Sequence, residues 1–280
     1  MSGSASRIIV PLDVSTLPEA VHMARRLAGH VAAVKIGKQL FTAEGPASIR
    51  AMHDLGFRVF LDLKYHDIPN TVAGAVAAAK SLGVWLLNVH ASGGTEMMRA
   101  AAKAAAGPDR PLVIAVTVLT SLSEDAFHSI TGTPRTVEAQ VRHLARETKA
   151  AGLDGVVASP HEIRAIRQEC GSQFLIVTPG VRPADASLND QQRVMTPAEA
   201  IRAGADYLVI ESTYGDRLHP DGTDKVEHLV SVINDTISRG GNVVIPSFAV
   251  GRTQEVIYEL HRAGEKYRDQ RMAFMQTQVY

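Results

Sequence analysis

Charged residues gather directly after an apolar run in Phe60-Leu61-Asp62-Leu63-Lys64-Tyr65-His66-Asp67-Ile68-Pro69-Asn70-Thr71. The run from Val59 to Leu63 is typical of a buried strand that ends in charged residues. Alternate side chains of a strand share a face, so Asp62 and Lys64 are expected to point the same way, and Asp67 to return to them from the turn.

This cluster is a candidate site because nearby carboxylates favour the protonated form of a lysine. Lys64 would then be an acid that lies beside concentrated negative charge. A surface salt-bridge cluster would have the same composition. The position at the carboxyl end of a strand favours the site, since parallel α/β sheets place their chemistry there.

The first 210 residues alternate short β-branched runs with helical patterns. The expected strands are residues 7–13, 31–37, 57–63, 84–90, 111–117, 154–158, 174–178 and 206–210. The expected helices are residues 17–28, 38–51, 71–82, 94–106, 136–151, 160–170 and 197–203. Eight strands in roughly 205 residues predict a closed (β/α)8 TIM barrel. A doubly wound open sheet is less favoured, because no G-x-G-x-x-G follows the first strand.

Composition indicates a globular protein of the cytoplasm. Hydrophobic residues make up 45% of the 280 residues, which is enough for a large core. The 29 basic and 29 acidic residues balance, so no general attraction to nucleic acid or membrane is expected. Cys170 is the single cysteine, which excludes an internal disulfide. No signal peptide or membrane-spanning run is evident.

A barrel would collect the residues just past each strand at one rim. Each of these residues alone has an ordinary explanation, such as a turn former or an interior histidine, but their joint appearance favours a site. They are Asp13, Lys35, Asp62, Lys64, Asp67, His90, Thr117, Thr120, Ser121, Ser159, Pro179, Gly180 and Arg182.

The motifs that contain these residues resemble the orotidine 5′-phosphate decarboxylase family over residues 7–210. They are Pro11-Leu12-Asp13, Val34-Lys35-Ile36-Gly37, His90-Ala91-Ser92-Gly93-Gly94, Thr117-Val118-Leu119-Thr120-Ser121, Thr178-Pro179-Gly180-Val181-Arg182-Pro183 and Asp190-Gln191, beside the stretch quoted first. The D-x-K-x-x-D element is shared with magnesium-dependent sugar-phosphate decarboxylases and synthases, which are the alternative. The longer run through Asp67-Ile68-Pro69-Asn70-Thr71 is specific to the orotidylate branch.

The resemblance implies decarboxylation of orotidine 5′-monophosphate to UMP in de novo pyrimidine synthesis, without a cofactor or metal. Lys64 would donate the proton, with Asp62, Asp67 and Lys35 in the same charged network. The implied substrate-binding residues are Asp13 and Lys35 for the ribose, Thr120 or Ser121 for the pyrimidine, and Arg182 and Gln191 for the phosphate. The resemblance also implies a homodimer in which Asp67 and Thr71 reach the partner's site.

The resemblance ends after residue 210. Family members have Gly-Arg there, and the arginine grips the phosphate, but this chain has Glu211 and Ser212. A carboxylate near a phosphate is repulsive, so impaired substrate binding is expected. Arg217 is a candidate substitute for the missing arginine.

Residues 211–280 form a foreign tail that resembles part of a β-CASP metallo-β-lactamase-fold nuclease. The matching runs are Glu211-Ser212-Thr213-Tyr214-Gly215-Asp216-Arg217-Leu218-His219 and Gly240-Gly241-Asn242-Val243-Val244-Ile245-Pro246-Ser247-Phe248-Ala249-Val250-Gly251-Arg252-Thr253-Gln254-Glu255. The H-x-H-x-D-H zinc motif of those enzymes is absent, so a nuclease is not expected; an inactive chimera with an RNA-related tail is a further alternative. An apolar stripe predicts a helix over 224–239 that could cover the barrel, and residues 242–248 form a spare strand.

Overall fold

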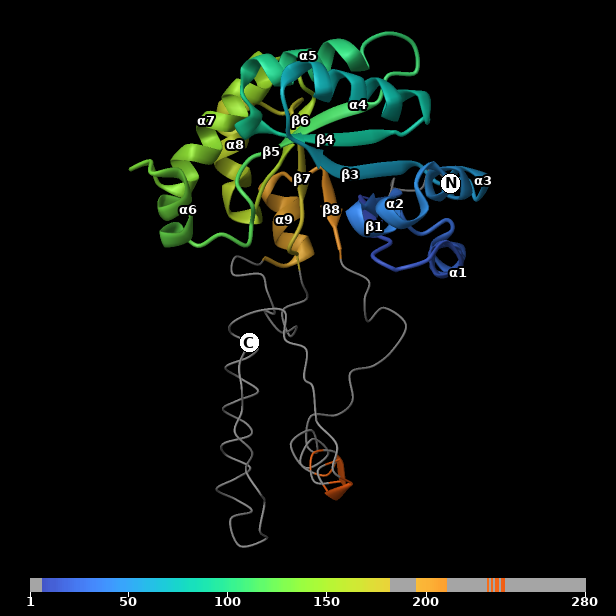
Figure 1. The fold of residues 1–280 in the computed structure, drawn as a ribbon. Coiled ribbons are helices and arrows are strands. Elements are labelled where there is room, and N and C mark those ends of the chain that lie inside the picture. Colours follow the sequence, from blue (N-terminus) through green and yellow to red (C-terminus); the bar gives the residue numbers. More distant parts are fainter. Residues whose placement is uncertain are drawn as a thin grey trace, which may run out of the picture. The chain divides into compact units, whose positions relative to one another are not determined.

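Eight parallel strands close into a barrel surrounded by helices (Figure 1). The computed structural model describes residues 7–181 and 195–210, and in the tail six separate residues, Ser231, Ile233, Asp235, Thr236, Ser238 and Arg239. The strands follow one another around the ring in chain order, and the pairs Ile8–Leu208 and Ile9–Val209 join the last strand to the first. The predicted (β/α)8 TIM barrel is confirmed.

All eight predicted strands are present, most of them shorter than the sequence pattern suggests. They are β1 (Ile8–Pro11), β2 (Ala33–Gly37), β3 (Val59–Tyr65), β4 (Leu86–His90), β5 (Leu112–Val116), β6 (Gly155–Val157), β7 (Leu175–Thr178) and β8 (Tyr207–Val209). The α-helices in these ranges are α1 (Leu17–Leu27), α2 (Lys38–Glu44), α3 (Pro46–Asp54), α4 (Pro69–Ser81), α5 (Thr95–Ala105), α6 (Glu124–Thr131), α7 (Val137–Ala150), α8 (Ile163–Cys170) and α9 (Pro197–Ala203). Short 3-10 turns, Ala91–Gly93 and Pro160–Glu162, precede α5 and α8.

Two connections differ from the sequence prediction. One helix is expected between β2 and β3, but the chain forms α2 and α3, separated at Gly45 by a φ of 57°. The polar connection after β5 is expected to lack a helix, but it contains α6. The Ser123 hydroxyl caps α6 by accepting the N–H of Ala126 at 3.2 Å. Acidic residues in the first turn stabilise the helix through its dipole.

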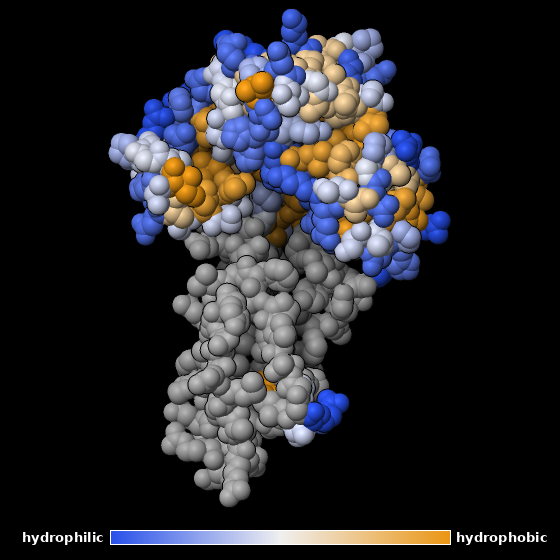
Figure 2. Space-filling model, viewed as in Figure 1, coloured by the Kyte–Doolittle hydropathy of each residue, from blue (hydrophilic) through white to orange (hydrophobic). Residues whose placement is uncertain are grey.

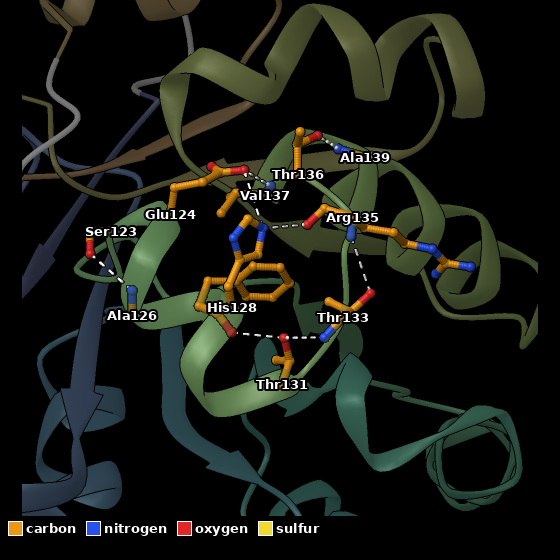
Figure 3. A network of polar contacts seen from close by, with 11 residues as sticks. Ser123, Glu124, Ala126, His128, Thr131, Thr133, Arg135, Thr136, Val137 and Ala139 are labelled. Carbon is orange, nitrogen blue, oxygen red and sulfur yellow. Dashed lines mark hydrogen bonds and ion pairs between the residues drawn. The ribbon is translucent and has the colours of Figure 1, made fainter.

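Side-chain contacts fold the connection between α6 and α7 back onto α6 (Figure 3). His128 Nε2 lies 2.9 Å from the carbonyl oxygen of Arg135, and Glu124 Oε1 accepts the N–H of Val137 at 2.9 Å. Thr136 caps α7, as its sequence position predicts. These contacts anchor the long excursion between β5 and α7.

Alternate side chains of the strands point into the barrel, and the others pack against the helices. The interior cluster comprises Ile9, Ala33, Phe60, Leu86, Ile114 and Val177. A larger cluster, which includes Val34, Leu61 and Leu87, lies on the other face of the strands. Two residues further along β2, β3 and β4, the interior positions become Lys35, Asp62 and Asn88. The apolar filling therefore ends where the charged site begins.

Strands β6 and β7 approach each other closely at Gly155. A Cβ at this position would lie 2.3 Å from the carbonyl oxygen of Leu175, a distance that real contacts do not reach. Glycine is therefore the residue that lets these two strands pair in the barrel wall.

The chain divides into two units, residues 1–215 and 216–280. In the second unit, five of the described residues are helical, which agrees with the helix predicted over 224–239: Ser231, Ile233, Asp235, Thr236 and Ser238. The predicted strand 242–248 lies outside the described residues, as do Glu211, Ser212 and Arg217.

Hydrophilic side chains cover much of the barrel unit on the face drawn in Figure 2, with apolar patches between them. The large apolar side chains with the most exposure in the described ranges are Ile68 (66%), Leu119 (42%) and Ile130 (70%). Within those ranges, no helix has the length and apolar character that crossing a membrane requires.

Candidate active site

Asp62 lies at the centre of a row of alternating charges at the carboxyl ends of β1, β2 and β3. Lys35 Nζ is 3.2 Å from Asp13 Oδ1 and 3.3 Å from Asp62 Oδ2. Lys64 Nζ is 2.6 Å from the other oxygen, Asp62 Oδ1. The prediction that Asp62 and Lys64 point the same way is confirmed by this contact.

The inner members of this row are largely removed from water. The side chains of Lys35 and Asp62 are 10% and 11% exposed, and that of Lys64 is 28% exposed, whereas Asp13 at the outer end is 54% exposed. Ion pairs interact more strongly in such surroundings than at an open surface, because the effective dielectric constant is lower. Loss of one member would leave its partner charged and buried.

Burial alone would raise the pKa of Asp62, but its neighbours reverse that effect. The charges of Lys35 and Lys64, together with hydrogen bonds from Lys64 and Asn88, lower its pKa below the ordinary value of 3.8. Asp62 is therefore a carboxylate at neutral pH. The site combines a fixed negative charge with an ammonium group that can donate a proton.

A cavity of about 210 Å³ opens beside these charges. Its lining combines charged and apolar side chains, and consists of Lys35, Phe60, Asp62, Lys64, Asn88, Val116, Val118, Leu119, Thr120, Val157, Val177, Pro179 and Val209. Such a lining suits a small planar or cyclic ligand with one polar edge.

The predicted site residues divide into those at the cavity and those away from it. Lys35, Asp62, Lys64 and Thr120 line the cavity, and Asp13 is joined to it through Lys35. Ser121 and Thr71 are exposed, and neither lines the cavity. Arg182 and Gln191 lie outside the described residues.

Asp67 does not return to Lys64 within this chain, contrary to the expectation from the turn. It is exposed, and among the described residues its carboxylate accepts the N–H of Ile68 at 2.6 Å and forms no ion pair. Its carboxylate is held by the neighbouring backbone between the end of β3 and the start of α4, and not by Lys64.

Sequence reasoning missed Asn88, which is 1% exposed and donates to Asp62 Oδ1 at 2.7 Å. A signal was available, because Asn88 lies two residues before His90 on the same face of the predicted strand. Among the described residues, no group of three or more His, Cys, Asp or Glu side chains is placed to hold a metal ion.

The fold and the site define a TIM-barrel protein whose cavity is built around ion-paired lysine and aspartate side chains. Residues 6–210 match the model of the Orotidine 5′-phosphate decarboxylase / HUMPS family. The chain belongs to this family.

Named relatives lie within the same family. Orotidine 5′-phosphate decarboxylase of Moorella thermoacetica is 56% identical over 210 residues, which cover 73% of this chain and 83% of that protein. The enzyme of Geobacter sulfurreducens is 53% identical over 220 residues, covering 77% of this chain and 92% of that protein. The crystal structure of orotidine 5′-phosphate decarboxylase from Lactobacillus acidophilus superposes with a TM-score of 0.66 at 35% identity, covering 74% of this chain and 90% of that one.

His90 should make the stability of the fold depend on pH. Burial, and then the nearby charges of His66, Lys64 and Lys38, lower its pKa from 6.5 to about 4. The unfolded chain therefore binds a proton at His90 more readily than the folded protein does. The stability that neutral His90 contributes to the fold is complete above pH 6.5 and is lost as the pH falls toward 4. We expect the melting temperature of His90→Asn, relative to wild type, to rise as the pH is lowered through this range.

The measurement is a series of thermal melts between pH 7.5 and 4.5, conditions chosen to bracket the range of the shift. His22→Asn, at an exposed position on α1, is the matched control and should follow the wild type throughout. A constant difference between His90→Asn and wild type at every pH would contradict the expectation.

Proposed function

We propose that this protein is an orotidine 5′-phosphate decarboxylase, a carboxy-lyase that converts orotidine 5′-monophosphate to UMP in pyrimidine synthesis. The observation that carries the proposal is the row Asp13, Lys35, Asp62 and Lys64 beside an apolar cavity. The relatives with this name are 50–56% identical over most of their length, which supports the same reaction here. We place the activity in the cytoplasm.

The reaction needs a proton donor beside a site that disfavours the substrate carboxylate. As CO₂ leaves, the electrons of the broken C–C bond remain on the pyrimidine carbon, and Lys64 Nζ donates a proton to that carbon to give UMP. Asp62 repels the carboxylate in the bound substrate, and this repulsion is relieved as CO₂ departs. Lys64 stabilises the negative charge that develops. Solvent then returns the proton to Lys64.

The remaining side chains would bind the parts of the substrate that do not react. Asp13 and Lys35 hold the ribose hydroxyls, and Thr120 or Ser121 meets the pyrimidine ring. Arg182 and Gln191 serve the phosphate. The place of Lys35 between Asp13 and Asp62 supports its assignment, because one ammonium group then links the ribose end to the reacting end.

Magnesium-dependent sugar-phosphate chemistry is the second candidate, because the D-x-K-x-x-D element of Asp62, Lys64 and Asp67 resembles that of such enzymes. The relatives at 50% identity or more carry the decarboxylase name, which favours the first candidate. Chelation separates the two: decarboxylation of orotidine 5′-monophosphate should continue in excess EDTA, whereas the magnesium-dependent reaction should stop.

Lys64→Ala should abolish most of the decarboxylation, because no other side chain would supply the proton. We expect kcat to fall by at least about 100-fold, as for loss of a general acid, with UMP formation measured by the change in ultraviolet absorbance. Lys80→Ala is the matched control, since Lys80 lies on α4 and donates to the carbonyl oxygen of Ala106 at 2.5 Å. Activity unchanged in Lys64→Ala would refute the assigned proton donor.

A homodimer would give Asp67 a role that it lacks in the single chain. Its carboxylate is exposed at the end of β3, and the adjacent Ile68 is 66% exposed, which suits an interface. We propose that Asp67 and Thr71 reach the cavity of a second copy, where Asp67 would flank that copy's Lys64. Each site would then need residues of both subunits.

Mixed dimers test this sharing of the site. Lys64→Ala and Asp67→Ala should each be nearly inactive alone. Dissociation in mild denaturant and reassociation of an equal mixture should restore about a quarter of wild-type activity, because half of the dimers are mixed and each has one intact site. No recovery from a mixture that reassociates, as followed by gel filtration, would show that Asp67 acts within its own chain.

The tail would limit phosphate binding. We propose that residues 1–210 are the barrel and that 211–280 are a foreign, partly β-CASP-like segment. The family match ends at residue 210, which supports this boundary. Glu211 and Ser212 would then stand where family members have glycine and arginine, and Arg217 would be the nearest substitute in sequence.

The double variant Glu211→Gly/Ser212→Arg should improve phosphate binding by removing a repulsive carboxylate and adding a bidentate donor. We expect KM for orotidine 5′-monophosphate to fall by about 10-fold, a charge-assisted hydrogen bond being worth roughly that much. Orotidine, which lacks the phosphate, is the control substrate and should gain nothing. An equal gain for both substrates would mean that the variant acts elsewhere.

A further inference from the structure

Asn88 is the buried polar side chain next to the charged row, and the proposed reaction has not yet given it a role. It lies on β4, is 1% exposed, and borders the cavity beside Asp62 and Lys64. A buried amide is retained at such a place when both of its ends have partners, because an unpaired polar group there is costly.

The pairing of β3 with β4 is irregular opposite Asn88, because β3 has more residues than β4 between two successive pairs. Phe60 pairs with Leu86 and Leu61 with Leu87, and the next pair is Tyr65 with Val89. Three residues of β3, Asp62 to Lys64, therefore stand opposite the single residue Asn88. A bulge of this kind interrupts the backbone ladder and redirects side chains, and bulges are common beside active sites.

The side chain of Asn88 replaces part of the interrupted ladder. Its Oδ1 accepts the backbone N–H of Lys64 at 2.8 Å. Lys64 has a φ of 53°, in the left-handed region that a lysine rarely adopts. Such a conformation persists where the surroundings hold it in place, and Asn88 supplies a direct contact to the strained residue.

The other end of the same amide fixes the carboxylate. Asn88 Nδ2 donates to Asp62 Oδ1 at 2.7 Å, and that oxygen also accepts from Lys64 Nζ at 2.6 Å. The chemistry sets the orientation of the amide, because a carboxylate cannot donate and a backbone N–H cannot accept. One side chain thus contacts both the backbone of the lysine and the carboxylate that the lysine faces.

We propose that Asn88 is a positioning residue that holds Lys64 in its left-handed backbone conformation and orients Asp62, so that the ammonium group and the carboxylate stay in register with the substrate. This inference rests on the proposed decarboxylation and deepens it. Asn88 itself is not required to touch the reacting atoms. Its loss would misplace the proton donor without removing any charged group from the site.

Asn88→Ala removes both hydrogen bonds. We expect kcat to fall by about 10- to 100-fold, the usual effect of a misplaced catalytic group, with KM within about threefold of wild type. The crystal structure of the variant should show Lys64 leaving the positive φ region. Thr148→Val is the matched control, because Thr148 is 0% exposed and donates to the carbonyl oxygen of Leu144 on α7, outside the cavity lining. It should lose stability and keep wild-type kcat.

Asn88→Asp keeps the shape and the acceptor for the Lys64 N–H, but places a second carboxylate against Asp62. The groups that face Asp62 are Lys35, Lys64 and His90, with Asp13 beyond Lys35. Repulsion between two adjacent carboxylates raises the pKa at which the pair binds its first proton. The acid limb of the kcat/KM profile should therefore move up by about one pH unit or more. An acid limb that stays in place would show that residue 88 is not coupled to Asp62, contrary to the inference.

The outcomes separate this inference from the proposed function. If wild type forms no UMP, the proposed function fails, and the structure of Asn88→Ala still tests the positioning. If Asn88→Ala does not fold, the pH profile of the isosteric Asn88→Asp still tests the contact with Asp62. Wild-type kcat in Asn88→Ala, or a Lys64 that keeps its positive φ and its contact with Asp62, would overturn the inference.

Discussion

The carboxylate of Asp62 is the interaction on which the site depends. Each of its oxygens meets a different lysine, and it links β2, β3 and β4 through Lys35, Lys64 and Asn88. A carboxylate this deeply buried would be unstable alone, because desolvation opposes the charged form. The cations are therefore part of the fold as well as of the chemistry, and loss of either lysine would leave the Asp62 carboxylate with less to offset its burial.

The barrel makes this arrangement possible by ending its apolar filling one layer below the site. Ala33, Phe60 and Leu86 fill the interior, and the residues two positions further along the same strands are Lys35, Asp62 and Asn88. Because alternate side chains of a strand share a face, a step of two residues along each strand leads from the core to the active site. The charges are consequently held on rigid strands, which limits their movement when a substrate binds.

The strands and the closed barrel were predictable, because they follow from local periodicity. The shared direction of Asp62 and Lys64 was predicted from the same periodicity, although Lys64 lies in a bulge with a φ of 53°. The sequence did not predict the bulge opposite Asn88, since the pairing register of β3 with β4 is set by contacts between distant residues. Asp67 also departs from the prediction. Its neighbours in sequence suggested a return to Lys64, but its carboxylate accepts the N–H of Ile68 instead. Helix α6 was not predicted, because it begins at a cap on Ser123 within a polar segment, where apolar periodicity is weak.

Closure of the barrel does not require the chain beyond residue 210. β8 pairs with both β1 and β7, and Ile210 donates its N–H to the carbonyl oxygen of Ile9 at 3.1 Å. The charged row lies on β1 to β3 and the turns after them, so its geometry is complete before the tail begins. In this chain the groups proposed for bond breaking and those proposed for phosphate binding therefore belong to separate stretches of sequence. If Glu211 and Ser212 stand at the phosphate as proposed, a change there would alter the grip on the substrate while the charges around Asp62 stay as they are.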